Sequence, residues 1–241
     1  MKTLCVIPAR YGSTRLPGKI LMDLGGHPMI WHVYQNVKRS QAFSDVVIAA
    51  DNELVKNACE SFGAKVVMTS TDCSCLIDRL YEVSEMIEAD YYISVNGDEP
   101  ILEAEVMGKV LPEDVVLDRP IVRGLARNFD NPAEVIDPGN MKMAIGKGGY
   151  CLYRSRSPIP YPQTTTNFSY KKYVGVELFN KMALDFYVNT EPTELEMIED
   201  IGALRFLEYG IPIHYDIVES KSISIDNAKD LEYVKKRMGL D

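Results

Sequence analysis

The first part of the chain alternates short apolar runs with longer amphipathic stretches. Short continuous apolar runs are typical of strands buried on both faces, whereas apolar residues at every third or fourth position indicate a helix. The apolar runs predict strands at residues 2–8, 46–50, 65–68 and 91–95. Between the last two of these, apolar residues recur at helical spacing at Leu76, Leu80, Val83 and Ile87. This alternation predicts a parallel sheet with helices on both faces.

Local signals fix the ends of two further helices. One is expected over residues 52–62, because Gly63 follows it and glycine is the usual left-handed residue that stops a helix. The other is expected to begin after Thr193, since Glu196 three positions later completes a capping box. This second pattern predicts one continuous helix that reaches about residue 209.

The second half of the chain is less regular than the first. Residues 141–145 and 150–154 predict a hairpin across a glycine-rich turn, and a strand at 213–218 and a helix at 227–238 are expected near the end. No internal repeat or clean boundary is visible. We therefore expect an α/β fold with a Rossmann-like, mostly parallel sheet, in which the whole chain forms one domain. The middle, about 100–190, is expected to form a smaller lobe inserted on that sheet.

Composition and charge narrow the classes of partner. The chain has 241 residues, of which 46% are hydrophobic and 25% charged, with a net charge of -9. This acidity argues against a nucleic-acid or membrane partner, which would require a broad basic face. No apolar run approaches the roughly 20 residues of a membrane span. The five cysteines form no disulfide framework, and Cys5 and Cys151 lie in strand-like runs, so buried thiols and a cytoplasmic location are expected.

The loop after the first predicted strand concentrates positive charge in this acidic chain. It reads IPARYGSTRLPGK and contains cations, hydroxyls and glycines at Arg10, Gly12, Ser13, Thr14, Arg15, Gly18 and Lys19. It is not a Walker A loop, which requires four residues between its glycines and a Ser or Thr after the lysine. Clustered cations repel one another unless a polyanion binds them, so a phosphate-binding loop is favoured. The alternative is a solvated charged turn.

A carboxylate is expected to face this loop. In an open parallel sheet, ligands bind beyond the carboxyl ends of the strands, at the point where the strand order reverses. If the order is 3-2-1-4, that point lies between the first and fourth strands, and Asp98 follows the fourth strand. Carboxylate and phosphate oxygens together are the usual ligands of Mg²⁺. Asp98 is therefore a candidate metal ligand; the alternative is an aspartate that only forms the turn.

The cationic loop closely resembles the start of CMP-Kdo synthetases, the 3-deoxy-manno-octulosonate cytidylyltransferases. Further segments resemble that family in the same order along nearly the whole chain, namely GHPMIWHVY, VVMTSTD, VNGDEP, MKMAIGKGGYCLYRSRSPIP and SIDNAKDLEYV. The resemblance implies a nucleotidyltransferase fold and a homodimer. It also implies Mg²⁺-dependent transfer of CMP from CTP to an acidic sugar, in which the sugar's anomeric hydroxyl attacks the α-phosphate and pyrophosphate leaves.

The resemblance also implies roles for individual residues. Catalytic roles are implied for Lys19, Arg10 and Asp98, and Mg²⁺ ligands are implied at Asp98 and Asp226. Nucleotide contacts are implied for Pro8, Ala9, Arg10, Gly12, Ser13, Thr14, Arg15, Lys19, Ser74 and Arg79. Acceptor contacts are implied for Asn96, Arg156, Tyr173 and Glu177.

The sequence departs from the family pattern mainly where the acceptor would bind. The segment Lys172–Phe179 lacks a His, a Tyr and the Arg of the family pattern, and Gly202–Arg205 lacks a Glu. In Cys73–Arg79 only the terminal acid and arginine of the family's segment remain. Each lost hydrogen bond changes binding by about 1 kcal/mol. A Kdo-like ulosonic acid is the expected acceptor. The alternatives are a different acid, such as a phosphonate or another sugar acid, and a nucleotide-binding module without catalysis.

Overall fold

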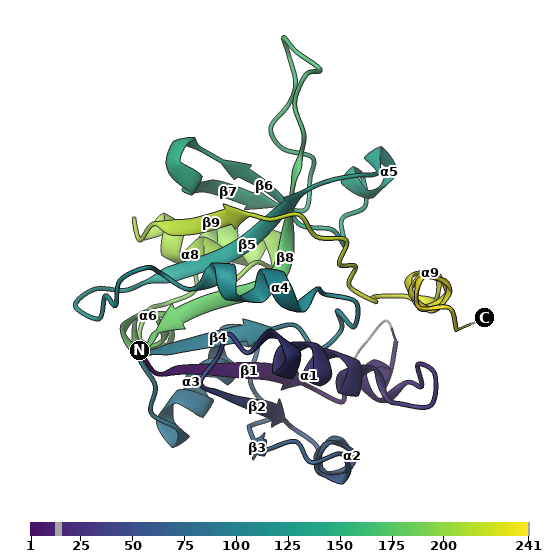
Figure 1. Ribbon diagram of the computed structural model, residues 1–241. Coiled ribbons are helices and arrows are strands. Elements are labelled where there is room, and N and C mark those ends of the chain that lie inside the picture. The colour runs from purple at the N-terminus through teal and green to yellow at the C-terminus, as the bar shows by residue number, and fades with distance from the viewer. Residues whose placement is uncertain (13–15, 241) are drawn as a thin grey trace. The chain divides into compact units, whose positions relative to one another are not determined.

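The computed structural model describes residues 1–12 and 16–240 (Figure 1). The chain divides into two compact units, which are described separately below. Unit 1 consists of Met1–Gly108 together with Ser220–Asp241, and unit 2 consists of Lys109–Glu219. Unit 2 is therefore inserted into the sequence of unit 1.

Unit 1 is built on a parallel sheet of four strands in the order β3-β2-β1-β4 (Figure 1). The strands are β1 (Thr3–Ala9), β2 (Asp45–Ala50), β3 (Val66–Met68) and β4 (Tyr91–Val95). The apolar runs predicted each of them to within two residues, because β1, β2 and β4 are buried along nearly their whole length. The order 3-2-1-4 is confirmed, and the reversal of strand order lies between β1 and β4.

Unit 1 also contains helices, several of which pack on these strands. They are η1 (Lys19–Leu21), α1 (Met29–Ser40), α2 (Glu53–Ser61), α3 (Leu76–Met86), α4 (Ala104–Met107), η2 (Gly108–Val110, which runs into unit 2) and α9 (Ala228–Met238). The predicted ends of α2 are confirmed, since Asn52 caps its first turn through the Leu54 N–H and Gly63 takes a positive φ of 81°.

A small apolar cluster joins the last helix to the first loop. Leu24 and Met29 pack with Ile225 and Val234, all four fully buried. Gly25 makes this packing possible, because a Cβ there would lie 2.6 Å from the Leu240 side chain. The cluster holds the segment that carries Asp226 against the start of the chain.

Unit 2 contains five strands and several short helices. The strands are β5 (Val122–Asn128), β6 (Lys142–Ile145), β7 (Cys151–Ser155), β8 (Lys171–Asn180) and β9 (Ile213–Ile217). The helices are α5 (Pro132–Val135), η3 (Lys147–Gly149), α6 (Lys181–Val188), α7 (Glu194–Glu199) and α8 (Ala203–Glu208). β5 pairs antiparallel with β8 and parallel with β9, while β6 pairs with β7 and β8 (Figure 1). The predicted hairpin is confirmed as β6 and β7.

The prediction of one continuous helix from Thr193 to about residue 209 is wrong, because the structure has two helices there. The predicted start is confirmed, since α7 begins directly after Thr193, whose N–H donates to the Glu196 carboxylate at 3.3 Å. The helix stops at Asp200, however, which takes a left-handed φ of 54°, and α8 begins three residues later. The break places Glu199 and Asp200 beside Arg156, whose guanidinium donates to both of their carbonyl oxygens.

A buried ion pair fastens α7 to α8. Arg205 Nε and Nη2 donate to the two carboxylate oxygens of Glu196 at 2.6 and 2.7 Å, and Tyr187 donates its hydroxyl to the same carboxylate. Burial alone would raise the pKa of Glu196, but the hydrogen bonds from Arg205 and Tyr187 lower it overall. This charged pair thus holds α7 and α8 of unit 2 together.

Within residues 1–12 and 16–240, no helix combines the length and the apolar character that crossing a membrane requires. None of the cysteines in this part of the chain forms a disulfide, and Cys5 and Cys151 are buried as predicted. Burial raises the pKa of the Cys151 thiol to about 11.

The first testable prediction concerns Glu196→Gln. This change leaves the Arg205 guanidinium buried without a countercharge, so the free energy of unfolding near pH 7 should fall by about 3–5 kcal/mol. The folded-state pKa of Glu196 lies below its usual 4.5, so the contribution of the ionised carboxylate to the free energy of unfolding is complete above that pH. The contribution is lost as the pH falls through the lowered value.

Urea unfolding measured between about pH 7 and about pH 3 checks this prediction. The difference in the free energy of unfolding between the wild type and Glu196→Gln should become smaller at about pH 3. Asp185→Asn is the control, because it removes an exposed helical ion pair with Lys181 and should change stability by less than about 0.5 kcal/mol. A difference that stays constant with pH would contradict the assignment.

Candidate functional site

Three charged side chains of unit 1 meet beyond the carboxyl ends of β1 and β4. Lys19 Nζ donates to Asp98 Oδ2 at 2.5 Å and to Asp226 Oδ1 at 3.1 Å. It also donates to the carbonyl oxygen of Ile225 at 3.0 Å. The three residues are far apart in the sequence, so the fold alone brings the two carboxylates to one ammonium group.

Backbone packing sets the position of Asp98. It follows Gly97, where a Cβ would lie only 2.6 Å from the carbonyl oxygen of Pro8. Only glycine therefore allows the loop after β4 to approach the end of β1 so closely. The Asp98 carbonyl then accepts a hydrogen bond from the Ile225 N–H at 2.9 Å, which places Asp226 beside it.

Further hydrogen bonds hold the segment that leads to Asp226 against the loop that contains Asp98. The Glu99 carboxylate accepts from Ser222 Oγ at 2.5 Å, and the Glu103 carboxylate accepts from Ser220 Oγ at 2.6 Å. The segment that leads to Asp226 is thus fastened along the loop that contains Asp98. The sequence pattern gave no sign of these serine–glutamate bonds.

The carboxylate pair fits a divalent cation. Asp98 Oδ1 is buried and has no hydrogen-bond partner among the residues that the structure describes. A buried carboxylate oxygen without a partner is unfavourable unless a cation completes it. Asp98 and Asp226, with side chains 21% and 18% exposed, leave room for the water and phosphate oxygens that complete the shell of Mg²⁺.

Electrostatics keep Lys19 charged at this position. Burial by itself would lower the pKa of the Lys19 ammonium. The carboxylates of Asp98 and Asp226 outweigh that effect through charge and hydrogen bonds, and its pKa is raised. The ammonium is therefore a permanent positive charge between two acidic groups.

The loop before Lys19 opens from the end of β1. Pro8 is half-buried and Ala9 fully buried, whereas Arg10 and Gly12 are exposed. Gly18, with a φ of 66°, caps η1, the short helix that carries Lys19. The predicted nucleotide contacts at Ser13, Thr14 and Arg15 lie outside the described residues.

Arg79 and a residue that sequence reasoning missed lie beneath this loop. Arg79 is only 4% exposed and donates to Thr69 Oγ1 and, at 3.2 Å, to Asp51 Oδ2. Asp51 Oδ1 accepts the N–H of Tyr11 at 2.9 Å. The one sequence sign of Asp51 was its place directly after a predicted strand, where parallel sheets carry ligand-binding loops.

The two other residues predicted near the nucleotide and acceptor in unit 1 make local bonds. Ser74 is exposed, and its hydroxyl and N–H both donate to the Asp78 carboxylate in the first turn of α3. Asn96 is half-buried, and its amide donates to Glu99 at 3.5 Å. Neither is drawn into the group around Lys19.

The predicted acceptor residues of unit 2 fall into two environments. Arg156 is 36% exposed and is held by carbonyl oxygens of Glu199, Asp200 and Pro138. The Glu199 carboxylate accepts the Arg156 N–H at 2.9 Å and the Ser155 hydroxyl at 2.6 Å. The Arg156 side chain is thus both anchored and partly open to solvent.

Glu177 and Tyr173 instead surround a buried arginine. Glu177 Oε1 accepts from Arg154 Nη1 at 2.5 Å and from the Tyr215 hydroxyl at 2.6 Å. The Tyr173 ring faces the same guanidinium, 4.6 Å from its centroid. Gly124 leaves space for this group, since a Cβ there would lie 2.3 Å from the Tyr215 ring. Glu177 is 4% exposed, so these contacts favour an internal role for it.

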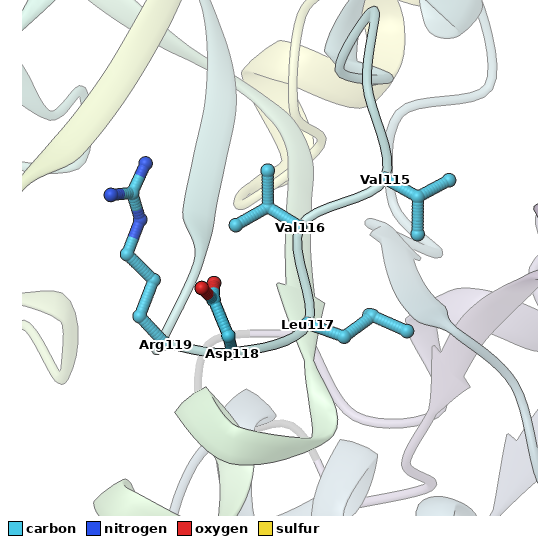
Figure 2. Close-up of a pocket in the computed structure, with 5 residues that line it drawn as sticks. All are labelled: Val115, Val116, Leu117, Asp118 and Arg119. Atoms are coloured by element: carbon cyan, nitrogen blue, oxygen red, sulfur yellow. The ribbon is translucent and has the colours of Figure 1, made fainter.

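Unit 2 also has a hollow of about 580 Å³ that no predicted site residue lines. It is formed by the consecutive residues Val115–Arg119, and Figure 2 shows their side chains projecting to different sides of the segment. Val115 and Leu117 are 49% and 45% exposed. Its mainly aliphatic lining lacks the clustered cations that a phosphate group requires.

Comparisons with known proteins agree with the geometry. The chain matches the family model described as cytidylyltransferase over residues 4–223. It is 36% identical to a protein of Escherichia coli named 3-deoxy-manno-octulosonate cytidylyltransferase, over 98% of this chain and 96% of that protein. It is 32% identical to a protein of Shewanella baltica named 8-amino-3,8-dideoxy-manno-octulosonate cytidylyltransferase, over 100% of both.

A solved structure is similar over nearly the whole chain. It is described as CMP:2-keto-3-deoxy-manno-octonic acid synthetase complexed with CTP. The two chains are 35% identical and superpose with a TM-score of 0.90, covering 99% of each.

The second prediction tests the charge balance at Lys19. In Lys19→Met, Asp98 and Asp226 repel each other without a cation, so the free energy of unfolding in metal-free buffer should fall by about 1–3 kcal/mol. Millimolar Mg²⁺ should then raise the thermal midpoint of the variant more than that of the wild type, because the metal replaces the missing charge.

Thermal unfolding with EDTA and with added MgCl₂ measures both effects. Lys65→Met is the matched control, because it removes a lysine of unit 1 whose partner Asp45 is 49% exposed. It should be nearly neutral and should gain no extra stabilisation from the metal. Equal responses of Lys19→Met and the control to Mg²⁺ would contradict the assignment.

Proposed function

The chain belongs to the cytidylyltransferase family, among the 3-deoxy-manno-octulosonate cytidylyltransferases, and we propose that it transfers CMP from CTP to an acidic sugar of that type with release of pyrophosphate. The resemblance based on sequence motifs is confirmed by the relatives, as is the class of enzyme. The α/β fold is confirmed as well.

One observation carries the proposal, namely the convergence of Lys19, Asp98 and Asp226 beside the cationic loop. A cation that touches two carboxylates is the arrangement expected where a metal-bound triphosphate is handled, since carboxylates alone would repel it. A non-catalytic nucleotide-binding module has no use for such a carboxylate pair.

We assign Asp98 and Asp226 as the residues that would hold Mg²⁺. When bound there, the metal would supply charge neutralisation for the phosphate oxygens of the nucleotide. The buried Oδ1 of Asp98 supports this assignment, because none of the described residues donates a hydrogen bond to it and a metal would have room to coordinate there.

The residues of the chain itself would bind and orient the triphosphate. The Lys19 ammonium and the exposed Arg10 guanidinium would neutralise its charge, and the exposed Gly12 backbone would allow close approach. By the resemblance, Arg15, Ser13 and Thr14 would add to these contacts, while Pro8, Ala9 and Ser74 would frame the nucleoside. Such charge compensation and alignment are what phosphoryl-group transfer chiefly requires.

In the proposed reaction the anomeric hydroxyl oxygen of the sugar forms a bond with the α-phosphorus of CTP. The bond between that phosphorus and the bridging oxygen to the β-phosphate breaks, so pyrophosphate leaves with that oxygen. The hydroxyl proton passes to solvent.

The acceptor would bind through its carboxylate. Arg156 is the best-placed residue of unit 2 for this task, because its guanidinium is fixed by carbonyl oxygens yet partly exposed. Asn96, Tyr173 and Glu177 stay predictions from the resemblance. Two relatives have names that differ only at C8 of the sugar, so 3-deoxy-manno-octulosonate and its 8-amino analogue are both candidate acceptors. A phosphonate or another sugar acid is the alternative.

We further propose a homodimer in the cytoplasm, as the resemblance implies. The free cysteines support a reducing compartment. Light scattering of the purified protein measures the mass of the assembly, and a monomer at micromolar concentration would contradict the dimer.

The third prediction is the substrate profile. A pyrophosphate-release assay that crosses the four nucleoside triphosphates with 3-deoxy-manno-octulosonate, its 8-amino analogue, other sugar acids and phosphonates should give turnover with CTP and an ulosonic acid. No release with any pair would refute the enzyme. Turnover with CTP and only a phosphonate would establish the alternative acceptor.

The fourth prediction concerns Asp98→Asn in the same assay. Turnover should fall by at least about 100-fold, because loss of a metal ligand exceeds the usual effect of its outer-shell partners. The fold should survive, since the residue lies in a loop. Asp45→Asn is the control in unit 1, and it should retain activity. Unchanged turnover in Asp98→Asn would place the metal elsewhere.

A further inference from the structure

We infer that Arg79 and Asp51 form a positioning pair that fixes the start of the phosphate-binding loop, and that Arg79 acts on the nucleotide only through this loop. The inference rests on the proposed function, since it takes the loop to be the triphosphate site. It adds Asp51, which neither the sequence motifs nor the resemblance selected, to the machinery.

The pair joins the carboxyl ends of three neighbouring strands. Tyr11, Asp51 and Thr69 lie just beyond the ends of β1, β2 and β3. Asp51 accepts the Tyr11 N–H at 2.9 Å, and Arg79 donates to both Asp51 and Thr69. The Thr69 hydroxyl donates in turn to the carbonyl of Ala50 at 3.1 Å, so the chain of bonds closes on β2.

Both backbone polar groups of Tyr11 are thereby held. Its N–H donates to Asp51, and its carbonyl accepts the Gly18 N–H at 3.4 Å. These two bonds fix the two ends of the loop, one next to Arg10 and the other next to Lys19. The anchor points next to Arg10 and Lys19 are thus set by the sheet, which pre-positions these two cations.

Burial argues that the pair serves position rather than stability. The side chains of Arg79 and Asp51 are 4% and 10% exposed. A buried ion pair gains little over apolar residues of similar volume, because desolvation offsets the attraction. What an apolar pair would not supply is a fixed acceptor for the Tyr11 N–H. The guanidinium fork suits this role, since it holds one carboxylate oxygen of Asp51 and leaves the other for Tyr11.

Burial also separates this role from direct contact with the nucleotide. Among the residues that the structure describes, the Arg79 guanidinium donates to Thr69 and Asp51, beyond the strand ends, and the side chain is almost inaccessible to solvent. Arg79 would therefore affect a ligand in the loop only indirectly, by fixing the position of Tyr11 through Asp51. The resemblance assigns Arg79 to the nucleotide, and the inference assigns it to the residues that support the nucleotide.

Binding of inorganic pyrophosphate and of CMP, each with Mg²⁺ and measured by calorimetry, tests the inference. Asp51→Ala should weaken pyrophosphate binding about 10-fold, which corresponds to about 1.4 kcal/mol. CMP binding should change by less than about 2-fold, because CMP lacks the β- and γ-phosphates that the loop would hold. Arg79→Met should give the same pattern, and the double variant should lose little more than either single variant.

Two further variants keep the test decisive. Asp51→Asn retains an oxygen for Tyr11 and should recover part of the pyrophosphate affinity, and it serves as the milder change if Asp51→Ala folds poorly. Arg205→Lys disturbs a comparably buried ion pair of unit 2, 8% and 11% exposed. It should lower thermal stability without weakening pyrophosphate binding.

The outcomes distinguish the possible failures. Wild-type protein that binds neither CMP nor pyrophosphate would overturn the proposed function and this inference with it. Wild-type binding that Asp51→Ala leaves intact would overturn the positioning pair alone. If Asp51→Ala weakened the binding of CMP and of pyrophosphate equally, the Arg79–Asp51 pair would have only a general structural role. Additive losses in the double variant would mean that Arg79 contacts the ligand independently of Asp51.

Discussion

The repulsion between two neighbouring carboxylates is the constraint on which the rest of this structure depends. Asp98 and Asp226 both lie within hydrogen-bond distance of one ammonium, and neither could hold its place so close to the other without a cation between them. Lys19 supplies that charge in the protein alone. The same positions suit a divalent cation, so the site exists as an arrangement of negative charge that some cation must always balance.

The fold maintains this arrangement with apolar packing and backbone bonds rather than with further charges. Gly97 permits close approach to β1, the Ile225 N–H fixes the Asp98 carbonyl, and Ile225 itself is buried in the cluster with Leu24 and Val234. Because such packing is close to crystalline density, it resists the displacement that repulsion would cause. The closing helix α9 is therefore part of the site, although its own residues carry none of the chemistry.

Sequence patterns predicted those features that local physics determines. The parallel strands β1, β2 and β4 were evident because they are buried along nearly their whole length, and Gly63 was evident because only a left-handed residue stops α2 there. The break at Asp200 was not evident, since the capping box at Thr193 specifies where a helix starts and not where it ends. Asp51 was missed for a related reason: its partner Tyr11 follows β1 and its partner Arg79 lies in α3, and no short motif joins them.

The charges of Lys19, Asp98 and Asp226 compensate one another once the fold brings them together, and this contact supports the roles proposed for them. Glu177 differs, because Arg154 and Tyr215 satisfy it inside unit 2. A polar side chain that the protein itself can satisfy is free to change its task as the neighbours change. Lys172–Phe179 lacks polar groups of the family pattern, so the residues that would bind the acceptor follow less directly from the sequence than those that would bind the triphosphate.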